Sequence, residues 1–285
     1  MQILLPIALF FLMVSVGMSL RITEVFANWQ RHRWGTWLCL LAATFLIPPG
    51  LALMLAKGFH LTLGETAGLF LVGAAPGAPL LTRNMAQKGF DLHMAASYQL
   101  WAALMVPVMI PLVVEAGGKL YGRDIWIPPG VLLRQITIKQ LLPLAVGMVI
   151  AWLWPKMAER FSPLLSSLGI VLLVVMIALV LYKLGPVLKQ LTLLVPVAAL
   201  LLAIGSIGAI LIFRMGSPAV RQTFAICNAN RHVGLALLLT GQYVQAKNAL
   251  PVVVCYALIA PLVMFAYVKV YPVKSVAPKP SLKSG

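Results

Sequence analysis

Long apolar stretches separated by short polar segments occupy almost the whole chain. Each stretch approaches the ~20 residues that a helix needs to cross the hydrocarbon core of a bilayer. Helices satisfy their own backbone hydrogen bonds, so they are expected in lipid where an open sheet is not. We therefore expect an all-α membrane protein whose nine spans lie at residues 2–20, 36–56, 65–87, 91–116, 136–155, 161–186, 191–213, 218–242 and 247–271.

Composition agrees with this pattern, because 61% of the residues are hydrophobic and only 10% are charged. A net charge of +16 would point to nucleic acid in a soluble protein. In a membrane protein, basic loops meet anionic lipid headgroups, so we expect the bilayer as partner and no nucleic acid. The cysteines Cys39, Cys227 and Cys255 lie in apolar segments at no metal-ligand spacing, which argues against a disulfide framework.

The loop charges also predict an orientation. The chain begins in an apolar run, which we interpret as a retained helix and not as a signal peptide. More basic loop residues fall on the face of the C-terminal tail than on the opposite face, to which we assign Lys57, Lys119, Arg123, Arg134, Lys139, Lys183, Lys189 and Lys247. The positive-inside rule then predicts an inner or plasma membrane protein with an outer N-terminus and a cytoplasmic tail, residues 272–285.

The acidic residues carry a further prediction. All of them fall in predicted loops or at predicted helix ends: Glu24, Glu65, Asp91, Glu115, Asp124 and Glu159. Proton relays and many sodium sites depend on a carboxylate at mid-membrane depth. We expect that signature to be missing here.

The third predicted span, "LFLVGAAPGAPLLTRNMAQKG", contains helix-breaking residues. Pro76, Gly77 and Pro79 lie mid-span, where proline removes a backbone hydrogen bond and clashes with the preceding turn. We expect a break there, and a plain proline kink is the alternative. Broken helices at this depth face protein or a wet cavity, so we add the polar residues that follow to the candidate site: Thr82, Arg83 and Asn84.

The eighth predicted span, "FAICNANRHVGLALLLT", is polar at its centre. Asn228, Asn230, Arg231 and His232 all lie within five residues of one another. An arginine at mid-membrane costs at least ~2.5 kcal/mol on insertion scales, so it needs a partner or a ligand. The alternative is an arginine that extends to the interface. We take these four residues as candidates for substrate or ion binding.

The two polar spans occupy matching places in the chain. If the chain divides near residue 127, residues 1–126 hold four helices and residues 127–271 hold five. Each polar span is then the second-to-last helix of its half, with Arg83 in one and Arg231 in the other. Matching interruptions in two halves are typical of inverted repeats that meet at a midplane site.

In order and spacing, "MVSVGMSL", "ATFLIPPGLALMLAKG", "LFLVGAAPGAPLLTRNMAQKG" and "NANRHVGLALLL" resemble the bile acid:sodium symporter family. The resemblance implies two inverted repeats, a panel and a core domain, and two discontinuous helices that cross in the core. It also implies carriage of organic anions, from bile acids and steroid sulfates to smaller carboxylates, usually with sodium bound behind the crossing.

Several matched positions depart from the family pattern. Cys227 stands where the family's glutamate is expected, Arg231 where its glutamine is and His232 where its asparagine is. Thr44 replaces a glutamine, and Met94 and Tyr98 stand near the expected fourth-span hydroxyls. A sodium site needs several hard oxygen ligands, so we assign no metal ligand and no cofactor with confidence, and Na⁺ is implied by the resemblance alone. Our hypothesis is that the Arg231 guanidinium replaces the cation and gives an anionic substrate a positive partner.

The sequence thus favours a secondary transporter of organic anions that works by alternating access. Proton coupling through His232 or His93, uncoupled transport, and a non-transporting binding or receptor scaffold are the alternatives. An enzyme is not expected, because we find no intramembrane Ser-His-Asp set, metal cluster or acid pair. The sequence sets neither the anion nor the oligomeric state.

Overall fold

The computed structural model describes residues 4–20, 34–77, 90–121, 127–188, 192–241 and 246–272. These residues are helical apart from connections and one isolated backbone bridge, which confirms the all-α prediction. The elements in chain order are α1 (Leu4–Ser19), α3 (Trp34–Leu41), η1 (Ala42–Leu46), α4 (Ile47–Gly58), α5 (Leu63–Ala74), α7 (Leu92–Tyr121), α8 (Pro129–Ile136), η3 (Thr137–Leu141), α9 (Leu142–Leu153), α10 (Pro155–Leu188), α11 (Leu194–Ile212), α12 (Pro218–Ala229), α13 (Val233–Thr240) and α14 (Ala246–Val270).

Within the described ranges, six helices are long and apolar enough to cross a membrane. Helices α1 and α5 are apolar but shorter, and the eighth predicted span is divided into α12 and α13. These helices fit a multi-pass membrane protein. The count of nine spans, the division into repeats near residue 127 and the orientation of the termini stay predictions.

One predicted boundary was wrong in a way that matters for the site. The fifth span was expected at residues 136–155, but its helix begins at Pro129 and continues through the π-helical turn η3 to Leu153. Proline suits the first helical turn, where its missing N–H has no partner to lose. Lys139, expected in a loop, therefore lies within η3, close to the middle of this 25-residue span.

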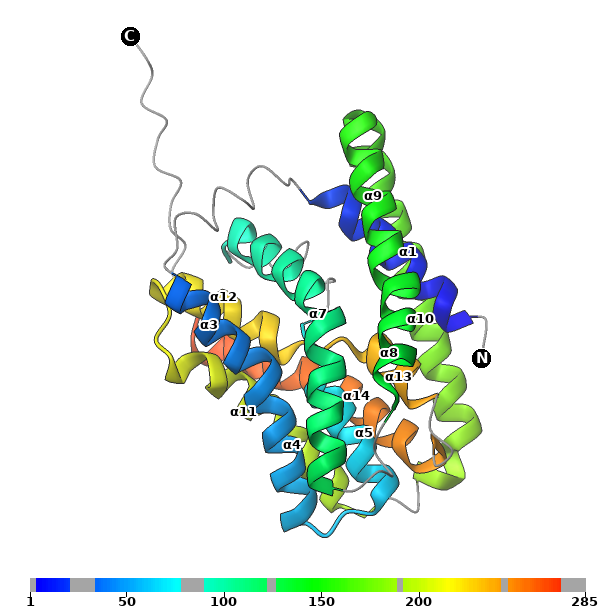
Figure 1. Cartoon of the computed structure of the whole chain (residues 1–285), viewed down its shortest axis with the longest axis vertical. Helices are drawn as coiled ribbons and strands as arrows, with labels where there is room; N and C mark the ends of the chain where they lie inside the picture. Colours follow the sequence, from blue (N-terminus) through cyan, green and yellow to red (C-terminus); the bar gives the residue numbers. More distant parts are fainter. Residues whose placement is uncertain are drawn as a thin grey trace.

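The helices form two groups: in Figure 1, α1, α9 and α10 lie on the right and α3, α4 and α11 on the left, with α13 and α14 reaching toward the right-hand helices. Helices α1, α9 and α10, with η3, pack together, and we call them the panel group. We call α3, α4, α5, α7 and α11 to α14 the core group, in which α4, α5, α11 and α14 contact one another. The crossing described below lies in the core group and faces the panel group.

Small residues and hydroxyls hold the panel group together. A Cβ on Gly17 would lie 2.2 Å from the Leu144 carbonyl oxygen, and one on Gly147 would lie 2.2 Å from that of Val14, so α1 and α9 touch through their backbones. The Ser15 hydroxyl donates to the Ser162 carbonyl at 2.8 Å and joins α1 to α10. Helices in lipid gain little from burying apolar surface, so close contacts and hydrogen bonds of this kind hold them together.

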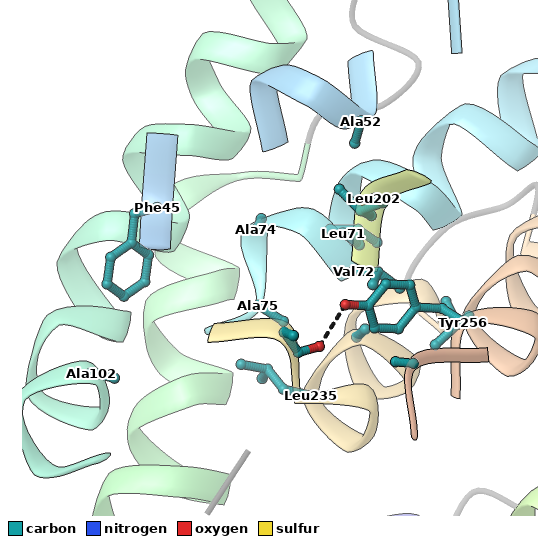
Figure 2. Close-up of a cluster of buried hydrophobic side chains, with 14 of the residues drawn as sticks. Phe45, Ala52, Leu71, Val72, Ala74, Ala75, Ala102, Leu202, Leu235 and Tyr256 are labelled. Carbon is teal, nitrogen blue, oxygen red and sulfur yellow. Dashed lines mark hydrogen bonds between the residues drawn. The ribbon is translucent and has the colours of Figure 1, made fainter. Parts of the chain in front are cut away.

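The core group has a dense apolar interior that includes one buried polar anchor. Figure 2 shows Phe45, Leu71, Leu202 and Tyr256, which come from four different helices and are all fully buried. The Tyr256 hydroxyl donates to the Ala229 carbonyl at 2.7 Å, which supplies the last residue of α12 with a donor. This bond ties α14 to the point where the eighth span is interrupted.

Candidate functional site

The described helix of the third span ends where the sequence predicted an interruption. Helix α5 begins with a capping box, in which Thr62 and Glu65 each bond the other's backbone, and it ends at Ala74. Ala75 is extended, with φ −71° and ψ 124°, which is the conformation that a residue before proline prefers. The predicted site residues Pro79, Thr82, Arg83 and Asn84 lie outside the described residues, and so does any continuation of the span before residue 90.

The eighth span is also broken, although it contains no proline at the break. Helix α12 ends at Ala229 and α13 begins at Val233, which leaves Asn230, Arg231 and His232 between them. The ring of His232 caps α13, because its Nδ1 accepts the Leu235 N–H at 3.1 Å. The His232 ring thus gives an acceptor to one of the N–H groups that have no helical partner at the start of α13.

The two breaks meet, and we call residues 75–77 together with residues 230–232 the crossover. Gly77 and Arg231 form an isolated antiparallel bridge, and the His232 N–H donates to the Pro76 carbonyl at 2.7 Å. A Cβ on Gly77 would lie 2.2 Å from the Cys227 carbonyl oxygen, so glycine is required there. The crossing of two discontinuous segments is therefore present in the described residues.

Arg231 lies inside the core group and does not extend to an interface. It is 1% exposed and is the largest of the fully buried side chains described. One terminal nitrogen donates to the Thr44 carbonyl at 2.9 Å and to the Ala75 carbonyl at 3.1 Å, and the other lies 3.4 Å from the Ser206 hydroxyl. In the part of the chain that the structure describes, no carboxylate contacts this guanidinium, and its Nε has no partner.

Asn228 connects three helices next to the crossover. Its amide donates to the Ala43 carbonyl at 3.0 Å and to the Ser206 carbonyl at 2.8 Å, and its oxygen accepts from the Tyr98 hydroxyl at 3.3 Å. The Tyr98 hydroxyl also lies 3.4 Å from that of Thr44. This predicted site residue is therefore fully buried, and its side chain is bonded to protein.

The other predicted residues are divided between the interior and the helix ends. Cys227 is buried on α12, and Asn230 is half-buried at the end of that helix. Met94 is buried at the start of α7, whereas the side chain of His93 lies outside the described residues. Among the described residues, no three His, Cys, Asp or Glu side chains gather as metal ligands would.

The described acidic residues lie toward helix ends, as predicted. Glu65 belongs to the cap of α5, and Asp91 precedes α7 and accepts the Met94 N–H. Glu115 lies toward the end of α7, 3.5 Å from the Lys119 ammonium. The side chains of Glu24 and Asp124 lie outside the described residues.

Two adjoining hollows separate the crossover from the panel group, and together we call them the interface hollow. They are small, with about 20 and 10 Å³ open to the centre of a water molecule, and they share Met13, Gln140 and His232. The first also reaches Pro76, Gly77 and Gln99, and the second reaches Lys139. His232 thus faces the hollow, while Arg231 lies behind the crossover and lines neither part of it.

Gln99, Lys139 and Gln140 were not predicted as site residues. Lys139 was counted with the basic residues at the end of a span because the helix was started seven residues too late, at residue 136 and not at Pro129. The double proline at Pro128 and Pro129 was the signal that could have corrected this, since proline favours the first helical turn. A lysine ten residues further on is then inside the membrane span.

Comparison with known proteins agrees with this architecture. A family model described as the sodium bile acid symporter family matches residues 6–191. Over 170 residues, 57% of this chain and 50% of the relative, the chain is 29% identical to an uncharacterized sodium-dependent transporter, YocS, of Bacillus subtilis. Over 213 residues, 72% of this chain and 48% of the relative, it is 29% identical to a probable sodium/metabolite cotransporter, BASS2, chloroplastic, of Oryza sativa subsp. japonica.

The chain spans about half the length of the curated relatives it matches. The family model covers well over half of the chain and includes the broken third span. The apolar helices agree with a multi-pass membrane protein, and the names of both relatives describe transporters. The chain belongs to the sodium bile acid symporter family.

Proposed function

We propose that this protein is a secondary transporter of small organic anions in which the guanidinium of Arg231 takes the place of a bound sodium ion. The observation that carries the proposal is the surroundings of this side chain. Two carbonyl oxygens and one hydroxyl oxygen surround the buried guanidinium. Oxygens of this kind are also the ligands that hard cations prefer in proteins.

A guanidinium in this position supports transport without sodium. It is fixed to the backbone and keeps its charge, because an arginine is not deprotonated in proteins. A second cation among the same three oxygens would meet a like charge in a region of low dielectric, which is unfavourable. The attraction between a cation and these three oxygens, which a sodium ion would provide only when bound, is therefore always present. Both relatives carry sodium in their names, so this chain is expected to differ from them.

The same charge supports an anionic substrate. In the described part of the chain, no carboxylate compensates Arg231, so the crossover carries a positive charge inside the membrane. The N-terminus of α13, which begins at the crossover, adds the positive end of a helix dipole. A carboxylate in the interface hollow would be attracted by both, and rocking of the panel group against the core group would carry it across.

Uptake into proteoliposomes tests this function. Candidate anions come from a thermal-shift screen of the purified chain, since a ligand that binds the native state raises its melting temperature. We expect saturable uptake and counterflow of such an anion at the same rate with sodium or with choline as the cation. A strict need for a sodium gradient would contradict the proposal, and binding without counterflow would favour a non-transporting scaffold.

Arg231→Gln tests the role of the guanidinium. The variant removes the charge but keeps an amide that can bond some of the three oxygens around the guanidinium. We expect it either to lose uptake or to become dependent on sodium, because the three oxygens are then open to an external cation. Melting temperature reports whether the variant folds. Sodium-independent uptake at the wild-type rate in a folded Arg231→Gln protein would refute the proposal.

A further inference from the structure

Lys139 is an ionisable residue in the middle of a membrane span. It lies on the π-helical turn η3, close to the centre of the span Pro129–Leu153. Met13 of α1 and His232 of the crossover line the same hollow as Lys139, so the three residues lie at a similar depth. Turns of this kind are rare and recur at functional sites. A charged residue at this depth is costly, and it is retained where it faces a cavity and has a task.

Lys139 lacks an acidic partner within the described residues. Glu115, for example, is paired with Lys119, 3.5 Å away. The lysine is half-buried and borders the second part of the interface hollow. A cation that faces a hollow in the membrane, with no counter-ion among the described residues, is suited to an anion that enters the hollow.

His232 presents a hydrogen-bond donor to the same hollow. Its Nδ1 accepts the Leu235 N–H, so the proton of the neutral ring is on Nε2. Gln140 is the residue after Lys139 on η3, is 6% exposed, and has a side-chain oxygen without a hydrogen-bond partner. A buried polar atom left without a partner is uncommon in native proteins and marks a place where a ligand or water binds.

We propose that Lys139 binds the carboxylate of a small substrate, with His232 as a hydrogen-bond donor from the opposite wall of the hollow and Gln140 as an acceptor for a hydroxyl of the same molecule. This inference rests on the proposed function and assigns its substrate contact. Arg231 does not make that contact, because it is buried behind the crossover and its bonds go to protein. Its charge acts on the anion through the field alone.

The two walls give this contact a consequence for the transport cycle. Lys139 belongs to the panel group, whereas His232 belongs to the crossover in the core group. An anion held by both would join the two groups, so its arrival and release would alter how firmly they are connected. The charge that recognises the substrate therefore also connects substrate binding to the movement of the groups.

Lys139→Gln tests the contact, with Lys57→Gln as its control. Lys57 is exposed at the end of α4, so that variant lowers the net charge equally without touching the hollow. The full chain is melted with acetate, lactate, pyruvate or succinate, and with the uncharged lactamide. We expect at least one carboxylate to stabilise wild type and Lys57→Gln, lactamide to have no effect, and Lys139→Gln to bind at least about tenfold more weakly.

The outcomes separate this inference from the proposed function. Equal binding by wild type and Lys139→Gln overturns the inference and leaves an anion transporter intact. Binding that depends on Lys139, without uptake by wild type, supports the anion site and contradicts transport. Stabilisation of wild type by none of the four carboxylates counts against both.

Chemical restoration of the ammonium distinguishes charge from packing. In Lys139→Cys, 2-aminoethyl methanethiosulfonate adds an ammonium through a disulfide, whereas methyl methanethiosulfonate adds a neutral methylthio group. We expect the first reagent to restore carboxylate-dependent stabilisation and the second not to restore it, with wild type treated in the same way as the control. A cysteine that reacts with neither reagent would show that this position faces away from the hollow and would overturn the inference.

Discussion

A methyl group on Gly77 is expected to force the crossover apart. In Gly77→Ala, the new Cβ would lie 2.2 Å from the Cys227 carbonyl oxygen and 2.7 Å from Cε1 of Tyr98. Neither neighbour can move easily: both residues are buried, and the Tyr98 hydroxyl is bonded to Asn228. The extended segment at residues 75–77 must therefore move away from α12.

The size of the effect follows from what this movement breaks. Overpacking in a filled core costs about 1–3 kcal/mol. Displacement of the segment also weakens the bond from the His232 N–H to the Pro76 carbonyl, which contributes about 1 kcal/mol. The expected loss of stability is about 2–4 kcal/mol. At about 2 °C per kcal/mol for a chain of this length, the melting temperature should fall by about 4–8 °C.

The assay is thermal melting of the purified chain together with anion uptake. Gly208→Ala is the matched control, because Gly208 lies inside α11 with nothing within 4 Å of the added Cβ. Alanine favours a helix over glycine by up to about 1 kcal/mol, so this control should melt at or slightly above the wild-type temperature. A Gly77→Ala protein with wild-type melting and uptake would refute the close contact on which the crossover depends.

Two further predictions concern the residues that hold the helices together. Asn228→Leu takes the amide donor from the Ala43 and Ser206 carbonyls and the acceptor from the Tyr98 hydroxyl, and a buried group that is left unsatisfied costs about 1–3 kcal/mol. Its melting temperature should therefore fall by an amount comparable to that of Gly77→Ala, and a wild-type melting temperature would contradict a bridging role. Gly147→Ala places a Cβ 2.2 Å from the Val14 carbonyl oxygen, so it should lower the free energy of unfolding by about 1–3 kcal/mol. Stability equal to that of Gly208→Ala would show that α1 and α9 are not in backbone contact.

The candidate site could be predicted in part from the two polar spans. Pro76 predicted the end of α5, because proline removes a backbone hydrogen bond from its helix whatever the tertiary surroundings are. Arg231 and His232 were recognisable because polar residues are rare at that depth. Lys139 was missed because its helix was started too late and because the face that η3 turns toward α1 is not local information.

Hydropathy along the chain determined the helical membrane fold, since lipid leaves the backbone no partner but itself. The same pattern located both interruptions. Tertiary structure alone decided that the two interruptions meet and that Arg231 points toward carbonyl and hydroxyl oxygens behind them. It also decided that His232 and Lys139 line the same hollow. These arrangements depend on contacts such as Gly77 with Cys227, which join residues about 150 positions apart. The order of residues along one helix does not contain them.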